Sequence, residues 1–217
     1  ETVDFAKLVY PNMQVADIFI QGITMAHAGS DQRKAHVVAR DVALRLKIRP
    51  LLHKKDTIKP LAIHHHLILG LGKPPMWPVS YEQMKELFLL LKMSKSKPDS
   101  CIFIHDSPDE IQRKLHHAFC PEGETVFNPV LDWSKHLIFP LQHEFRVERD
   151  RKYGGDLTYE SYSSLEMDFV EKRLHPTDLK QAVARALIAI LEPARKHFEK
   201  PKIKEMKLEL ERLKITR

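Results

Sequence analysis

The sequence predicts an α/β fold over residues 1–106, followed by a mostly helical segment over residues 107–217. Two apolar runs rich in branched and aromatic residues, "LAIHHHLILGLG" and "CIFIH", are typical of buried strands in the first segment. In the second segment, "DLKQAVARALIAILEPARKHF" repeats its apolar residues with helical spacing. The strands are therefore expected before residue 106 and the long helices after it.

The first forty-odd residues combine a stretch broken by proline with the segment "DQRKAHVVARDVALRL". That segment predicts a helix, because its apolar face is formed by Ala35, Val38, Ala39 and Val42. Residues 73–80, "KPPMWPVS", contain three prolines and are not expected to form regular structure. "YEQMKELFLLL" then predicts a short helix that leads into the loop "KMSKS" at residues 92–96.

The helical segment begins with capping chemistry in "SPDEIQRKLHHAF". Ser107 can cap the helix, Pro108 suits its first turn, and Glu110 completes a capping box. The core face of this helix is predicted to consist of Ile111, Leu115 and Phe119.

Two further helices are predicted towards the end of the sequence. The first has an apolar face formed by Leu179, Val183, Ala186, Leu187, Ile190 and Leu191. The second, in the tail "KPKIKEMKLELERLKITR", is amphipathic, with an apolar side of Ile203, Met206, Leu210 and Leu213.

The composition indicates a soluble, basic protein. The 217 residues carry a formal net charge of +6, which predicts a polyanionic partner such as nucleic acid, although a slightly basic surface is the alternative. The two cysteines, Cys101 and Cys120, are too few for a disulfide framework and fit a reducing, cytoplasmic environment. No apolar run is long enough to span a bilayer and the first residues are unlike a signal peptide, so we expect no membrane partner.

The loop "KMSKS" has the composition of a site for a polyphosphate. Its ammonium groups and hydroxyls can neutralise a pyrophosphate leaving group as charge builds on it during nucleotidyl transfer. A solvated turn of lysine and serine is the alternative for these five residues taken alone.

"KMSKSKPDS" resembles the signature loop of class I aminoacyl-tRNA synthetases. "YPNMQVADI" is similar to the amino-acid pocket segment of the archaeal/eukaryotic-type tyrosyl-tRNA synthetases, and "DQRKAH" to the next segment of that family. "KYGGDL" and "LHPTDLK" resemble its anticodon-binding region, so the segments follow the family order from about residue 5 to about residue 198. The resemblance implies the second half of a Rossmann-like class I synthetase catalytic domain (residues 1–106), followed by an α-helical anticodon-binding domain (residues 107–217).

The resemblance also implies the activity, which is ATP-dependent activation of tyrosine and its transfer to tRNA(Tyr). The positions that match the tyrosine pocket are Tyr10, Gln14, Asp17 and Gln32. A buried carboxylate at Asp17 that accepts a hydrogen bond from the phenolic hydroxyl would reject phenylalanine, which would leave it unpaired. Taken without the resemblance, the residues favour Tyr10 and Gln14 as packed loop residues and Asp17 as a helix cap.

By the same resemblance, Lys92 and Lys95 are the catalytic lysines that stabilise the leaving pyrophosphate. The residues expected beside ATP are Gly29, Asp31, His64, Met93, Ser94 and Ser96. Ala28 departs from the family, which has a glycine there, and its methyl group would narrow the approach of the nucleotide. ATP is expected as a substrate with Mg²⁺, and no tightly bound cofactor is predicted.

Five further positions match residues that contact tRNA in this family. Arg33 and Lys34 correspond to residues that read the first base pair of the acceptor stem, and both side chains can reach phosphates and guanine edges. Tyr153, His175 and Asp178 correspond to residues that hold the first anticodon base, by stacking and by a carboxylate that accepts from its edge. The ordinary alternatives are a solvated helix face, a surface tyrosine, a histidine before proline and an aspartate that caps the long helix.

The segment "IHHH" raises the question of a metal site, because His64 and His66 would project from the same face of a strand. A structural zinc site needs four ligands, and no nearby Cys or His residues have the spacing that would complete such a set, so no metal is predicted.

Two features depart from the family pattern. A second signature of class I synthetases, similar to "HIGH", is absent from the sequence, so we expect the chain to be the C-terminal portion of such an enzyme and inactive alone. An insertion also precedes the signature loop, over residues 73–90. The alternatives are the related tryptophanyl enzyme and a non-catalytic tRNA-binding fragment or paralogue, and a homodimer is implied by the resemblance.

Overall fold

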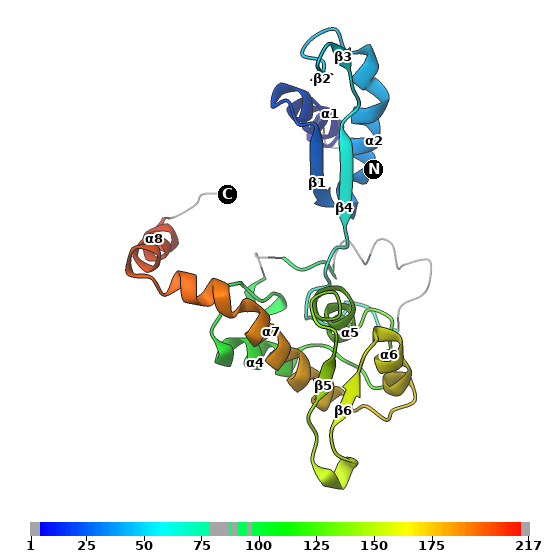
Figure 1. The fold of residues 1–217 in the computed structure, drawn as a ribbon, viewed down its shortest axis with the longest axis vertical. Coiled ribbons are helices and arrows are strands. Elements are labelled where there is room, and N and C mark those ends of the chain that lie inside the picture. The colour runs from blue at the N-terminus through cyan, green and yellow to red at the C-terminus, as the bar shows by residue number, and fades with distance from the viewer. Residues whose placement is uncertain (1–4, 79–86, 88–90, 95–96, 214–217) are drawn as a thin grey trace. The chain divides into compact units, whose positions relative to one another are not determined.

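The computed structural model describes residues 5–78, 87, 91–94 and 97–213 of the chain. It divides into two compact units, Glu1–Leu67 (unit 1) and Ile68–Arg217 (unit 2), each described here by itself (Figure 1). This division follows the packing of the chain. The domain boundary predicted between residues 106 and 107 concerns function and stays a prediction. The helix expected over residues 81–91 also stays a prediction, because only residues 87 and 91 of it are described. Lys95 and Ser96 lie outside the described residues.

Unit 1 is built on a pair of parallel strands, with two helices that pack on each other. The helices are α1 (Phe5–Ile20) and α2 (Arg33–Val42). Strand β1 (Met25–Gly29) pairs with β4 (Leu61–His65), in a register that runs from Met25 opposite Leu61 to Gly29 opposite His65. A short antiparallel hairpin, β2 (Leu52–His53) and β3 (Asp56–Thr57), precedes β4.

The core of unit 1 lies between its two helices. Residues Val15, Ile18 and Phe19 of α1 pack with Ala35 and Ala39 of α2 and with Ala43 and Leu51. Val38, which we expected on this face, is 46% exposed, because the buried stripe of α2 follows Ala35, His36 and Ala39 instead.

The stretch predicted to be broken by proline is in fact the continuous helix α1, with Pro11 inside it. Proline has no N–H to donate to the carbonyl four residues earlier, so the helix lacks one backbone bond at this point. The Asn12 side chain donates to the Leu8 carbonyl at 3.2 Å.

The buried strand predicted over "LAIHHHLILGLG" is wrong in length and in burial. Strand β4 ends at His65, and exposed and half-buried residues alternate along it, with Leu61 and Ile63 exposed. Strand β4 pairs with β1 alone among the described residues, so each of the two strands has one edge without a partner strand there.

Unit 2 is mostly helical, as predicted, and contains one antiparallel hairpin. Its helices are α4 (Pro108–His117), α5 (Pro129–Trp133), α6 (Tyr162–Val170), α7 (Pro176–Phe198) and α8 (Pro201–Arg212). Strands β5 (Phe145–Val147) and β6 (Leu157–Tyr159) form the hairpin, and a π-helical turn, Ser134–Ile138, follows α5 (Figure 1). No helix in the described part of the chain is long and apolar enough to cross a membrane.

Helices α4 and α7 contribute much of the core of unit 2. Ile111 and Leu115 of α4 and Leu179 and Val183 of α7 are fully buried. The predicted cap is confirmed, since the Ser107 hydroxyl accepts from the Glu110 backbone N–H at 3.2 Å. Such a cap satisfies an N–H that has no partner within the helix.

The strand predicted over "CIFIH" is wrong, because the chain turns there. The Asp106 carboxylate accepts from the Phe103 N–H at 2.9 Å, and Asp106 also forms a buried ion pair with Lys114 of α4 at 2.6 Å. A side chain that bonds to nearby backbone offers the chain an alternative to a strand.

Both cysteines are free thiols. Burial raises the pKa of Cys120 to about 11, so its thiol is a poor nucleophile at neutral pH.

Candidate functional site

The residues predicted to hold tyrosine and ATP in unit 1 gather around the carboxyl ends of its parallel strands. Gly29 ends β1, Asp31 and Gln32 lie in the 3₁₀ turn that follows, and His64 is the penultimate residue of β4. Ligands of open α/β sheets bind outside the carboxyl ends of the strands, so this edge is a suitable place for a substrate.

Helix α1 contributes the other predicted tyrosine residues from one face. Tyr10, Gln14 and Asp17 are spaced by four and three residues, which places them above one another along the helix. The Gln14 side-chain amide donates to the Gln32 side-chain carbonyl, so the structure brings these two predicted residues together. The Gln14 carbonyl and the Gln32 amide remain available to a ligand.

Asp17 lies inside α1 and faces solvent, so the alternative that it caps a helix is wrong. Among the described residues, no hydrogen bond to its carboxylate is found. Tyr10 is 64% exposed and, like Gln14, lies on a helix, so the alternative of packed loop residues is wrong as well.

Gly29 is required by packing at the end of β1. A Cβ at this position would lie 2.6 Å from the Leu67 side chain and 2.8 Å from the Asp31 carboxylate. Any side chain at this position would displace Asp31, a neighbour predicted to contact ATP.

A pair of histidines connects α2 to β4. The Nδ1 atom of the buried His36 lies 2.9 Å from Nε2 of His64, and the ring centroids are 5.0 Å apart. Burial, and then the neighbouring His64, lowers the pKa of His36, so His36 stays neutral over a wider pH range than a free histidine. The sequence-based prediction missed His36, although it directly follows Ala35, the first apolar position of the same helix.

Arg33 and Lys34 occupy the first turn of α2 and are exposed. Their side chains are free to reach a large ligand in solvent. Whether they read an acceptor stem stays a prediction.

In unit 2, the two arms of the "KMSKS" loop are held by one short segment, residues 68–71. On the first arm, which ends in the opening residues of the loop, the Met93 N–H donates to Ile68 O at 2.7 Å and the Gly70 N–H to Leu91 O at 2.6 Å. On the arm after it, the Leu71 N–H donates to Ser100 O at 3.0 Å. The loop therefore projects from a clamp of backbone hydrogen bonds.

Gly70 lies at the centre of this clamp. A Cβ at Gly70 would lie 3.1 Å from Leu91 O and 3.3 Å from Ser100 O, which belong to the two arms. The glycines of "LGLG" were visible in the sequence, but their role depends on this non-local pairing.

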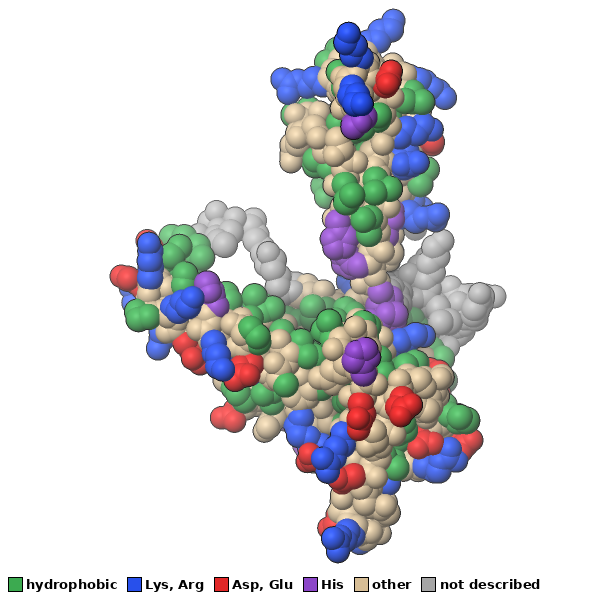
Figure 2. Space-filling view, viewed as in Figure 1, with side chains coloured by type: hydrophobic (Ala, Val, Ile, Leu, Met, Phe, Trp, Pro, Cys, Tyr) green, Lys and Arg blue, Asp and Glu red, His purple; other side chains and the backbone are tan. Residues whose placement is uncertain are grey.

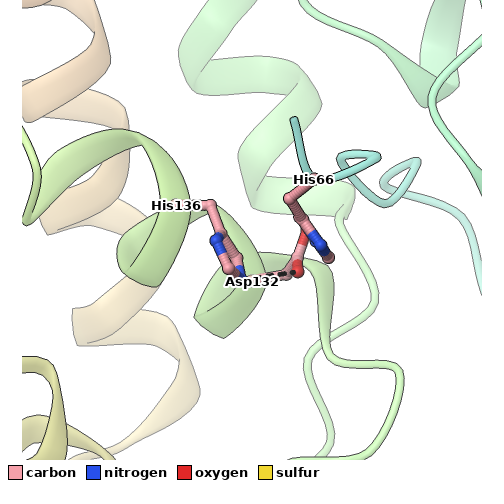
Figure 3. A group of neighbouring side chains, drawn as sticks. All are labelled: His66, Asp132 and His136. Carbon is pink, nitrogen blue, oxygen red and sulfur yellow. Dashed lines mark ion pairs between the residues drawn. The ribbon is translucent and has the colours of Figure 1, made fainter. Parts of the chain in front are cut away.

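The clamp segment is in turn fixed by α5. The Asp132 carboxylate accepts from the Leu69 N–H at 3.0 Å, and the Trp133 indole donates to Leu69 O at 2.7 Å. Figure 3 shows Asp132 beside His136, whose Nε2 lies 3.9 Å from Oδ1 of Asp132. The third residue drawn, His66, belongs to unit 1. Within unit 2, Asp132 has a structural role, because its carboxylate accepts a hydrogen bond from the Leu69 N–H. The expectation that the protein binds no metal stays a prediction.

Tyr153 is presented at the tip of the β5–β6 hairpin. It is 62% exposed and is followed by Gly154 and Gly155, whose φ angles of +95° and +75° favour glycine. The Asp150 carboxylate caps the turn by accepting from the Lys152 N–H at 3.0 Å. The Lys152 ammonium lies over the tyrosine ring, 4.8 Å from its centroid, so a base that stacks on this ring would use its other face or displace the lysine.

His175 and Asp178 lie at the start of α7. His175 is the helix cap, because its Nδ1 accepts from the Thr177 N–H at 3.2 Å. The alternative in which Asp178 is the cap is therefore wrong, and Asp178 sits in the first turn. Arg149 of the hairpin loop donates to the Arg173 carbonyl at 2.9 Å and thereby ties the hairpin to the segment before α7.

A family profile described as tRNA synthetases class I (W and Y) matches residues 1–192. The chain belongs to this class I synthetase family. Among its curated relatives are proteins named tyrosine–tRNA ligase from Pyrococcus abyssi, 56% identical, and Thermococcus kodakarensis, 57% identical. Each alignment covers 100% of this chain and 58% of the relative, so the chain spans a little over half the length of these synthetases.

Solved synthetase structures agree with this assignment. The tyrosyl-tRNA synthetase from Pyrococcus horikoshii, complexed with L-tyrosine, has a TM-score of 0.86 and 57% identity, and the match covers 94% of this chain and 56% of that one. The tryptophanyl-tRNA synthetase from Aeropyrum pernix has a TM-score of 0.58 at 19% identity, over 92% of this chain and 49% of that one, which shows the fold alone. The class I synthetase fold predicted from the sequence is confirmed.

Proposed function

We propose that the protein to which this chain belongs is a tyrosine–tRNA ligase, which activates tyrosine with ATP and transfers it to tRNA(Tyr). The observation that carries the proposal is the identity of 56–57% to proteins of that name along the whole chain. The tyrosine in the P. horikoshii structure and the Gln14–Gln32 contact support it. The family profile covers both the tryptophanyl and the tyrosyl enzymes, but the tryptophanyl-tRNA synthetase structure is only 19% identical.

The chemistry proposed needs no covalent enzyme intermediate. The tyrosine carboxylate attacks the α-phosphorus of ATP, which enters with Mg²⁺, and pyrophosphate leaves. A terminal hydroxyl of the tRNA then attacks the tyrosyl carbonyl, and AMP leaves. Lys92 and Lys95 stabilise the charge on the leaving pyrophosphate, while Gln14, Asp17 and Gln32 position the amino acid.

We further propose that residues 107–217 bind the anticodon. The exposed Tyr153 ring stacks on the first anticodon base, and His175 and Asp178 hold it from the start of α7. Arg33 and Lys34 contact the acceptor stem. A cytoplasmic location and a homodimer are proposed with the same family assignment.

The amino-acid specificity provides the test. In the complete protein, Asp17→Ala should lower the preference for tyrosine over phenylalanine roughly tenfold or more, because a charge-assisted hydrogen bond to the phenol is lost. The measurement is ATP–pyrophosphate exchange with each amino acid. Asp41→Ala, which changes an exposed carboxylate on α2, is the control. An unchanged preference in Asp17→Ala would contradict the assigned role.

A further inference from the structure

Two hollows in unit 2 lie outside the residues assigned above. The first, of about 600 Å³, lies between α4 and the first half of α7, and its lining includes Arg113, Thr177, Lys180, Gln181 and Arg185. The second, of about 450 Å³, lies where the end of α7 meets α8, and its lining includes His105, Arg195, Phe198, Lys204 and Lys207.

Both hollows lie along one face of α7. The α7 residues that line them include Thr177, Gln181, Arg185, Glu192 and Arg195, which are spaced by one turn or, between Arg185 and Glu192, by two turns.

Helix α4 runs antiparallel to α7 beside the two hollows. The Lys180 ammonium donates to His116 O at the end of α4 at 3.1 Å, and the His105 ring, just before α4, lies 5.2 Å from Phe198. The two hollows thus follow each other along α7, the first beside α4 and the second beside α8 and the segment that precedes α4. We call this face, from Thr177 to Lys204, the α7 track.

The α7 track is rich in positive charge. Its two hollows are lined by seven Lys or Arg side chains and three Asp or Glu side chains. Figure 2 shows Lys and Arg side chains over α8, with Asp and Glu between them. An electropositive groove of this kind favours an anionic partner.

Some of these charges are already compensated. Arg113 is paired with Asp99 and Glu110 at 2.7 Å each, Lys196 with Glu192 at 2.9 Å, and Lys207 with Glu211 at 2.9 Å.

Other charges are left without a close carboxylate in the described part of the chain. Lys180 and Arg195 donate to backbone carbonyls, which leave their charge in place, and Arg185 approaches Glu148 only to 3.8 Å. In addition, Nη2 of Arg185 and Nη1 of Arg195 are buried and have no hydrogen-bond partner among the described residues. Phosphate oxygens are the acceptors that guanidinium groups favour.

We propose that the α7 track binds the sugar–phosphate backbone of an RNA strand that continues from the base pocket at the start of α7. This inference rests on the proposed function, because the strand belongs to the tRNA. Thr177 lines the first hollow and lies between His175 and Asp178, so the track continues directly from that pocket.

Two features favour RNA over an acidic peptide. The second hollow is lined by the half-buried rings of His105 and Phe198, which give a base an aromatic surface to contact, while His105 also stacks on Phe103 with centroids 5.5 Å apart. From Lys180 to Arg195 the helix rises about 22 Å, a length that serves several successive phosphates.

The test measures the binding of a tRNA(Tyr) transcript to the complete protein at several salt concentrations. Lys180→Ala and Lys204→Ala should each weaken binding roughly twofold to fivefold. Each should also reduce the slope of log affinity against log salt by about 0.7, as expected for one lost phosphate contact on a single strand. Lys202→Ala, on the same helix as Lys204 but outside both hollows, is the matched control and should change neither quantity.

Other outcomes separate this inference from the proposed function. If Lys180→Ala and Lys204→Ala bound the transcript with the same affinity and salt dependence as Lys202→Ala, the α7 track would be overturned. Tyrosine-dependent ATP–pyrophosphate exchange by the same protein would still support the ligase. A wild-type protein that performs this exchange but binds no tRNA would overturn the track together with the proposed anticodon site, and would leave only the activation of tyrosine supported. If the track variants lost affinity for polyglutamate as much as for RNA, the occupant would be an acidic polypeptide and the inference would be wrong.

Discussion

His36 is a buried histidine whose charge state links the stability of unit 1 to pH. Burial, and then His64, lowers its pKa in the folded protein, so the unfolded chain binds more protons below about pH 6.5. The stability that comes from neutral His36 is therefore present above pH 6.5 and is lost as the pH falls from 6.5 towards the folded pKa. We expect His36→Gln to lose less of its unfolding free energy than the wild type between pH 7.5 and pH 5.5.

Urea unfolding at the two pH values measures this difference. His105, whose pKa is also lowered by burial, contributes acid sensitivity to both proteins, so the comparison between them isolates His36. His53→Gln changes an exposed histidine on β2 and serves as the control. Identical pH dependence in wild type and His36→Gln would refute the role of this pair.

At the residue scale, local chemistry was predictable and pairings between distant segments were not. The Ser107 cap follows from four consecutive residues and is confirmed. The His36–His64 pair depends on how α2 lies against β4. At the start of α7, His175 is the helix cap, although Asp178 is of a residue type that more often caps helices. Sequence patterns alone could not decide between such partners.

At the scale of elements, the clamp of the "KMSKS" loop predicts a strong effect of a single methyl group. Gly70→Ala would press against the carbonyls of both arms, Leu91 O and Ser100 O, and neither backbone can yield easily. We expect turnover in ATP–pyrophosphate exchange by the complete protein to fall roughly tenfold or more, because the lysines shift from their productive position.

Gly72→Ala is the matched control, because nothing lies within 4 Å of a Cβ added there. It should leave turnover nearly unchanged. Equal losses in the two variants would show that the clamp does not position the loop.

The helices were easier to predict than the strands for a physical reason. Helix α7 repeats its apolar residues from Leu179 to Leu191, over about three turns, so the pattern can be recognised locally. Leu179, Val183, Ala186 and Leu187 are buried as predicted. Strands β5 and β6 have three residues each and owe their existence to their mutual pairing, and they were missed. The apolar side of α8 was also predicted, yet Met206 and Leu210 remain exposed.

At the scale of the whole molecule, the predicted roles are divided between the two units. The tyrosine residues lie in unit 1, and the loop lysines and the anticodon residues lie in unit 2. The family assignment, and not the geometry of either unit alone, relates these roles to one reaction. The anticodon residues, however, lie wholly within unit 2 and can be tested independently of the catalytic chemistry.

Asp178 and Tyr153 should affect anticodon recognition in different ways. Stacking on Tyr153 tolerates any base and contributes about 1–3 kcal/mol, so Tyr153→Ala should weaken binding of every tRNA by a similar factor. A carboxylate accepts only from a base edge that presents donors, as guanine does with its ring N–H and its amine. Because His175 caps α7, Asp178→Ala should leave the helix intact and selectively remove the preference for guanine at the first anticodon position.

The measurement compares binding of tRNA(Tyr) transcripts that differ only at the first anticodon base, with the complete wild-type protein and both variants. Glu122→Ala removes an exposed carboxylate elsewhere in unit 2 and is the control. If Asp178→Ala weakened all transcripts equally, its carboxylate would serve the positive end of the α7 dipole and not the base. A loss confined to the guanine transcript would instead show that the start of α7 reads the anticodon through hydrogen bonds, while the hairpin supplies affinity.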